Sequence, residues 1–92
     1  MDRTELEIQR GERAALLLQD ELLTEALETI ETEYTEQWKS SPVRDVEGRE
    51  KLFLMVKTAQ KFRAELESVL TTGKLAKATL AQRLGQKLNP FS

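Results

Sequence analysis

The sequence predicts an all-α protein: a long antiparallel helical hairpin with flanking N- and C-terminal helices, forming one small helical bundle over residues 1–92. Leucine and alanine dominate the 39% of residues that are apolar, and only five residues are aromatic, which is typical of helices rather than sheets. Four glycines and two prolines leave long stretches without a helix-breaking residue. Within these stretches apolar residues recur at spacings of three and four, the period of an amphipathic helix.

The first predicted helix covers residues 12–18 and contains a run of three leucines at 16–18. Because Gly11 costs about 1 kcal/mol relative to alanine in a helix interior, we expect this helix to begin after it. Asp20 offers an N-cap for the next helix, with Glu21 in its first turn. The sequence permits either a break at Asp20 or one helix that continues through it.

The second predicted helix covers residues 21–39, where one apolar stripe is separated from many glutamates and threonines. The members of the stripe are 4, 3, 4 and 4 residues apart, which places them on one helix face. A Ser-Ser-Pro turn at 40–42 ends the helix, because proline disfavours helical backbone at the residue before it. The stripe consists of Leu23, Leu27, Ile30, Tyr34 and Trp38.

The third predicted helix covers residues 45–72, and either Ser41 or Asp45 could cap it. Its apolar residues are spaced by 3, 4, 3, 4 and 3, a heptad pattern that we expect to face the second helix in an antiparallel pair. Gly73 is well placed to close this helix in the left-handed conformation. The predicted hairpin core, expected to be mostly buried, consists of Leu27, Ile30, Tyr34, Leu52, Met55, Ala59, Phe62 and Leu66.

The last predicted helix covers residues 74–88 and carries leucines at i, i+4 and i+8 beside several cations. It could pack on the hairpin of its own chain or dock on a neighbouring copy or partner, and the sequence leaves both open. Phe91, beyond a proline, is a candidate interface anchor, with a disordered chain end as the alternative. The interface candidates of this segment are Lys74, Lys77, Leu80, Arg83, Leu84, Lys87, Leu88 and Phe91.

Tyr34 and Trp38 are two further interface candidates, because tyrosine and tryptophan often dominate the energetics of binding surfaces. The alternative is that both rings fill the closed end of the hairpin. In that case they would pack against Val43, Val46, Leu52 or Phe53.

Charge is divided along the chain: residues 1–50 hold 14 acidic and 6 basic side chains, and residues 51–92 hold 2 acidic and 8 basic ones. The two parts therefore carry net charges of −8 and +6. The opposite signs could match across the hairpin, join the acidic face of one copy to the basic segment of the next, or leave the basic segment to contact nucleic acid. Nucleic-acid binding is disfavoured because the acidic remainder would repel phosphate.

The chain has no cysteine and no histidine, so we expect no disulfide, no thiolate or imidazole metal ligand and no cysteine nucleophile. Glycine-rich phosphate loops and nucleophile-elbow motifs do not occur. The glutamates of residues 21–36 alternate with threonine around a solvated face instead of converging on a cation. We therefore expect no enzymatic activity, no catalytic residue, no cofactor and no metal. We also expect no membrane association, since no apolar run approaches the length of a span.

Several short motifs lie between residues 13 and 74. They are Ala14-Ala15-Leu16-Leu17, Glu25-Ala26-Leu27 with Glu31, Trp38-Lys39, Arg49-Glu50-Lys51-Leu52-Phe53, Glu65-Leu66 and Thr72-Gly73-Lys74. In this combination the stretch, about two thirds of the chain, resembles small helical proteins encoded in the head and packaging gene region of tailed bacteriophages. The resemblance implies a component of a virion or of its assembly, located in the host cytoplasm or the virion.

These observations predict a non-enzymatic protein–protein interaction or assembly factor that acts as a homo-oligomer or with another phage structural protein. The alternative is a small intracellular regulator or adaptor that binds nucleic acid or a host protein through its basic C-terminal helix. A discrete oligomer that is indifferent to DNA would favour the first function, and salt-dependent retention on DNA would favour the second.

Overall fold

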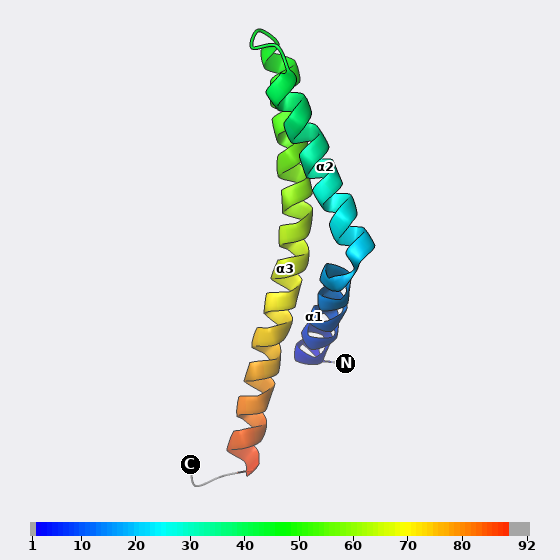
Figure 1. Cartoon of the computed structure of the whole chain (residues 1–92). Helices are drawn as coiled ribbons and strands as arrows, with labels where there is room; N and C mark the ends of the chain where they lie inside the picture. The colour runs from blue at the N-terminus through cyan, green and yellow to red at the C-terminus, as the bar shows by residue number, and fades with distance from the viewer. Residues whose placement is uncertain (1, 89–92) are drawn as a thin grey trace. The chain divides into compact units, whose positions relative to one another are not determined.

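The computed structural model describes residues 2–88, with side chains up to residue 85, and within that range it contains three helices and no strand. The helices are α1 (Arg3–Gln19), α2 (Glu21–Ser40) and α3 (Val46–Leu88) (Figure 1). The predicted all-α class is confirmed. Two compact units share these helices: unit 1 joins the described residues up to Leu17 with those from Leu66 onward, and unit 2 is Leu18–Glu65.

The junction between α1 and α2 lies at Asp20, so the chain breaks there instead of continuing as one helix. The Asp20 backbone is extended, and its carboxylate Oδ1 accepts a hydrogen bond of 3.0 Å from the backbone N–H of Leu23. This bond satisfies one of the N–H groups that a helix start leaves without a partner. α1 itself begins at Arg3 and passes through Gly11, so the expectation that the first helix starts after this glycine is wrong.

The start of α3 is capped by Asp45 and not by Ser41. Asp45 Oδ1 accepts a hydrogen bond of 3.0 Å from the N–H of Gly48, whereas the Ser41 N–H closes α2 by donating to the carbonyl of Trp38. From Val46 the helix continues without interruption to Leu88, and no described glycine has a positive φ. The predicted helices at 45–72 and 74–88 are therefore a single helix, and the expected left-handed turn at Gly73 is wrong.

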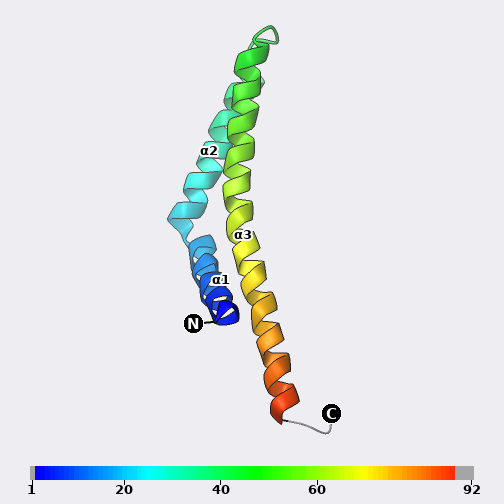
Figure 2. The same cartoon turned by 180° about the vertical axis from the view of Figure 1, so that it is seen from behind.

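In unit 2, α2 runs antiparallel beside residues 46–65 of α3 (Figures 1 and 2). We call these two segments the α2–α3 pair. Of the predicted core, Leu27 and Ala59 are buried and Tyr34 and Leu52 are half-buried, while Leu66 is half-buried within unit 1.

Three members of the predicted core are exposed. Ile30, Met55 and Phe62 keep 40%, 44% and 52% of their surface accessible, so the expectation that they are mostly buried is wrong. The physical reason is that the face by which each helix of the pair contacts the other is shifted by one residue from the predicted apolar stripe. Glu31 is more buried than Ile30, and on α3 the half-buried Val56 and Arg63 directly follow the exposed Met55 and Phe62.

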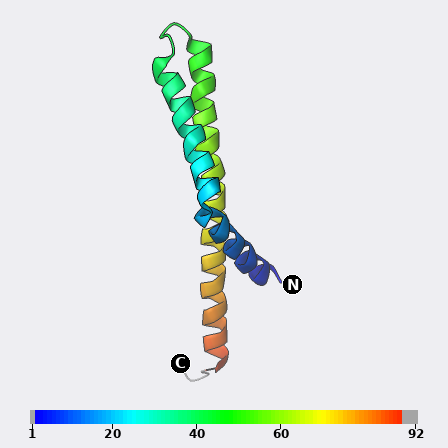
Figure 3. The same cartoon turned by 45° about the vertical axis from the view of Figure 1, so that its right-hand side comes forward.

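In unit 1, α1 crosses α3 (Figure 3), and two glycines, Gly11 and Gly73, lie where the backbones are close together. A Cβ atom placed on Gly11 would lie 2.7 Å from the Cα of Gly73, and one on Gly73 would lie 2.9 Å from the carbonyl oxygen of Glu7. Ala14 and Ala76 are buried in the same unit. Small residues thus let the two backbones touch, which explains why both glycines lie inside helices.

We predict that Gly73→Ala destabilises the protein by about 1–3 kcal/mol, because the added methyl group overlaps the backbone of α1. Gly85→Ala is the matched control, since nothing lies within 4 Å of a Cβ at that position. It should gain up to about 1 kcal/mol from helix propensity alone. Thermal unfolding followed by circular dichroism measures both changes, and equal stabilisation by the two substitutions would contradict the close crossing.

Candidate interaction interface

The described residues bury little large apolar surface. The buried hydrophobic residues are Ala14, Leu27, Ala59 and Ala76, and no large side chain is fully buried. Large exposed apolar patches on a soluble protein mark surfaces that contact other molecules. The exposed large apolar residues are Leu6, Leu16, Leu17, Leu22, Ile30, Trp38, Val43, Val46, Phe53, Leu54, Met55, Phe62, Leu75 and Leu84.

The interface candidates of the basic segment lie on α3 in unit 1. Lys74, Lys77 and Arg83 are exposed, Leu84 is about half exposed and Leu80 is half-buried. This surface therefore combines cations with an accessible leucine. The side chains of Lys87 and Leu88, and the whole of Phe91, lie outside the described residues.

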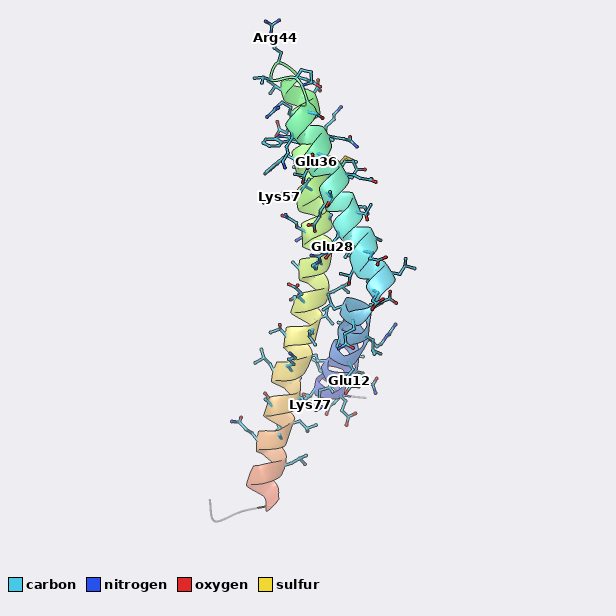
Figure 4. The ribbon with its side chains drawn as sticks, viewed as in Figure 1. Glu12, Glu28, Glu36, Arg44, Lys57 and Lys77 are labelled. Atoms are coloured by element: carbon cyan, nitrogen blue, oxygen red, sulfur yellow. The ribbon has the colours of Figure 1, made fainter. Side chains whose placement is uncertain are left out.

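The start of the basic segment packs within its own chain. Gly73 touches Gly11, and Ala76 is buried in the same unit. Glu12 of α1 and Lys77 of α3 line the same shallow hollow beside this crossing (Figure 4). Gly73 and Ala76 are thus buried against the rest of unit 1, whereas Lys74 and Leu75 between them stay exposed, as does most of the segment beyond them.

Trp38 belongs to a contact that closes the turn between α2 and α3. The guanidinium of Arg49 lies 4.8 Å from the centre of the Trp38 ring. Its Nη1 donates hydrogen bonds to the carbonyl oxygen and hydroxyl of Ser41, at 3.2 and 3.1 Å. Trp38 is nevertheless 38% exposed, and Val43 and Val46, two of the residues considered as packing partners for its ring, are themselves exposed. The ring therefore combines a structural role with an accessible surface, while Tyr34 is half-buried.

Arg49 was missed by the sequence analysis, although its position carries a signal. It lies one turn into α3, at the level where the last carbonyl groups of α2 have no partner within their own helix. A cation at that place can bind those carbonyls and stack on the aromatic ring that precedes the turn.

Glu31 and Arg63 each bury one polar side-chain atom in unit 2. Oε1 of Glu31 and Nη2 of Arg63 are fully buried, and neither has a hydrogen-bond partner among the described residues. Glu31 was expected on a solvated face, and the apolar pattern gives no reason to expect Arg63 inside the α2–α3 pair. Buried polar atoms without partners destabilise a fold, so the contact between α2 and residues 46–65 of α3 contributes less stability than a wholly apolar contact would.

The ion pairs of the described residues all lie within single helices: Arg3–Glu7 on α1, Glu36–Lys39 on α2 and Lys61–Glu65 on α3. None of them joins α2 to α3. α2 carries six glutamates and one lysine, a net charge of −5, and residues 46–65 carry three glutamates and five Lys or Arg, a net charge of +2. The complementary charges of the α2–α3 pair are therefore not used in direct contacts between its two helices.

Within residues 2–88 no three His, Cys, Asp or Glu side chains come together as a possible metal site. Across the same residues, no helix combines the length and apolar character that a membrane span requires. No protein-family model, curated protein or solved structure matches the chain.

We predict that Arg49→Met destabilises unit 2 by about 1–2 kcal/mol, because it removes the hydrogen bonds to Ser41 and the charge over Trp38. Arg44→Met is the control, since Arg44 is exposed in the same turn and points away from it (Figure 4). Urea unfolding followed by the fluorescence of Trp38, the one tryptophan, reports on this contact directly. Equal effects of the two substitutions on the free energy of unfolding would show that Arg49 acts only through its positive charge and not through its contacts with Ser41 and Trp38.

We also predict that Glu31→Leu and Arg63→Leu each stabilise the protein by about 1–2 kcal/mol, since each replaces a buried polar atom that lacks a partner. Glu25→Leu, at an exposed position six residues before Glu31, should change stability by less than about 0.5 kcal/mol. The comparison uses thermal unfolding at one protein concentration. A loss of stability in Glu31→Leu would mean that its carboxylate is satisfied in solution.

Proposed function

We propose that this protein is a non-enzymatic association factor that binds other helical chains, including copies of itself, through the accessible apolar faces of its helices. The observation that carries the proposal is the imbalance between a few buried, mostly small apolar residues and many exposed large ones. Apolar surface on this scale is stabilised by removal from water, and a partner provides that removal.

The setting that we propose is a phage particle or its assembly pathway, where the chain would act as an oligomer or with another structural protein. This setting is supported by the resemblance of residues 13–74 to small helical proteins of phage head and packaging regions. The basic surface of Lys74, Lys77 and Arg83 beside Leu84 offers a second contact for an acidic partner surface.

A second candidate function is a regulator or adaptor that binds nucleic acid through that basic surface. It is favoured by the absence of any acidic residue from Ser68 to the chain end, while Lys74, Lys77 and Arg83 are exposed. Phosphate binding by a few cations is strongly salt-dependent, so it can be separated from apolar association by raising the salt concentration.

We predict that the chain forms a discrete oligomer whose mass, measured by light scattering, persists at about 0.5 M salt and is unchanged by added DNA. Apolar contacts tolerate this salt, whereas charge contacts at the surface are screened over less than about 8 Å. A monomer that is retained on DNA at low salt would contradict the proposal. If the triple substitution Lys74→Gln, Lys77→Gln and Arg83→Gln abolished that retention, the second function would be supported.

A further inference from the structure

The two sides of the α2–α3 pair differ in chemistry. The residues of the pair that face inward follow a spacing of three and four: Thr24, Leu27, Glu31 and Tyr34 on α2, and Leu52, Val56, Ala59 and Arg63 on α3. Two sides of the antiparallel pair flank these inward residues. The positions directly before Thr24, Glu31, Val56 and Arg63 lie on one side. The positions directly after Leu27, Tyr34, Leu52 and Ala59 lie on the opposite side. The first set, the apolar side, is Leu23, Ile30, Met55 and Phe62; the second, the polar side, is Glu28, Thr35, Phe53 and Gln60.

The apolar side is arranged in two layers. Leu27 and Ala59, the two buried residues of unit 2, serve as the reference level along the pair. Ile30 lies three residues after Leu27, and Met55 lies four residues before Ala59, so the two are level to within one residue. The same count in the other direction brings Leu23 level with Phe62. Seven residues separate the layers along each helix, which corresponds to about 10 Å. Each layer therefore holds one large apolar side chain from each helix.

These layers are not covered by the chain's own unit. Ile30, Met55 and Phe62 remain about half exposed, and Leu23 is half-buried. Solvated positions beside a two-helix seam are commonly charged, and an apolar residue there widens the seam into the face of a larger bundle. Four-helix bundles are built from such widened faces.

The net charges of the two helices indicate which partner covers the apolar side of the pair. The net charge of −5 on α2 is complementary to the net charge of +2 on residues 46–65, and no ion pair joins them within the chain. A second copy supplies a helix of each sign. Opposite charges then meet only if α2 of each copy lies against residues 46–65 of the other, because the reverse orientation places two acidic helices together.

We propose that the apolar side packs against the same side of a second copy and forms a symmetric four-helix bundle with both turns at the same end. This deepens the proposed function, on which it rests, by naming the partner and the surface. Each layer then holds four large apolar side chains, and every helix lies antiparallel to both of its neighbours.

One charge pair follows from this geometry. Glu33 lies one turn after Ile30 and Lys51 one turn before Met55; both are exposed, and neither takes part in an ion pair of the described residues. In the four-helix bundle, Glu33 of one copy is level with Lys51 of the second copy at the border of the Ile30–Met55 layer. The two-fold axis forms this pair twice.

The first experiment compares Phe62→Ser with Phe53→Ser. The two phenylalanines are 52% and 50% exposed, yet only Phe62 belongs to the apolar side, so Phe53 is a matched control. We expect Phe62→Ser to raise the dimer dissociation constant roughly 30-fold, as for a residue at the centre of an interface, and Phe53→Ser to leave it within about threefold. Sedimentation measures the constant, and circular dichroism verifies that both variants remain helical.

The second experiment tests the orientation. Because the chain has no cysteine, Arg44→Cys places a single spin label in each turn. Turns at the same end of the bundle put the two labels within about 20 Å, whereas opposite ends separate them by about 45 Å. Lys51→Glu should weaken the dimer, and Glu33→Lys added to it should restore the parent dissociation constant.

The outcomes separate this inference from the proposed function. A dimer unaffected by Phe62→Ser, or affected equally by both phenylalanine substitutions, overturns the apolar side as the interface while association itself stands. Labels about 45 Å apart, or a double charge exchange without rescue, overturn the orientation. A chain that remains monomeric overturns both the dimer and the association of copies that it rests on.

Discussion

The crossing of α1 and α3 in unit 1 depends on small residues. Gly11 and Gly73 bring two backbones together, Ala14 and Ala76 are buried in the same unit, and in unit 2 Ala59 is buried together with Leu27. Small side chains allow helix axes to approach closely, which increases dispersion contacts along the crossing. They also contribute little apolar area, so large side chains lie beside the contacts and stay partly in water. The exposed apolar faces are a consequence of this packing and not a separate feature.

The local signals in the sequence were sufficient for the all-α class and for two candidate caps, but not for the bounds of every helix. Asp20 and Asp45 each accept a bond from an N–H group three residues on, which a short polar side chain before a periodic stretch predicts. Glycine was ambiguous, because a glycine can end a helix or lie at a close crossing. Gly73 was expected to end one. Only the presence of Gly11 on another helix decides between the two roles, and no local pattern contains that information.

The contact face between α2 and α3 shows a second limit of periodicity. On α3, Met55 and Val56 are both apolar, and Leu52, Ala59 and Leu66 belong to either of two faces that differ by one residue, so the apolar pattern does not separate these faces clearly. The face that turns inward includes Arg63 and Glu31, which an apolar pattern cannot select. Exposure of Lys74, Lys77 and Arg83 followed from their charge. The role of Arg49 depends on the path of the turn, and its position one turn into α3 was the only signal for it in the sequence.

Charge and apolar surface have different tasks in an association of this kind. An exposed ion pair contributes at most about 1 kcal/mol and is screened by salt, so the division of charge along the chain cannot by itself hold two chains together. It can choose between arrangements of equal apolar burial, since juxtaposed like charges cost energy in every wrong orientation. A strongly acidic α2 beside a mildly basic start of α3 provides such a choice. The apolar residues then supply affinity without specifying direction, and the charges specify direction with little affinity, which is why neither feature alone defines the interface.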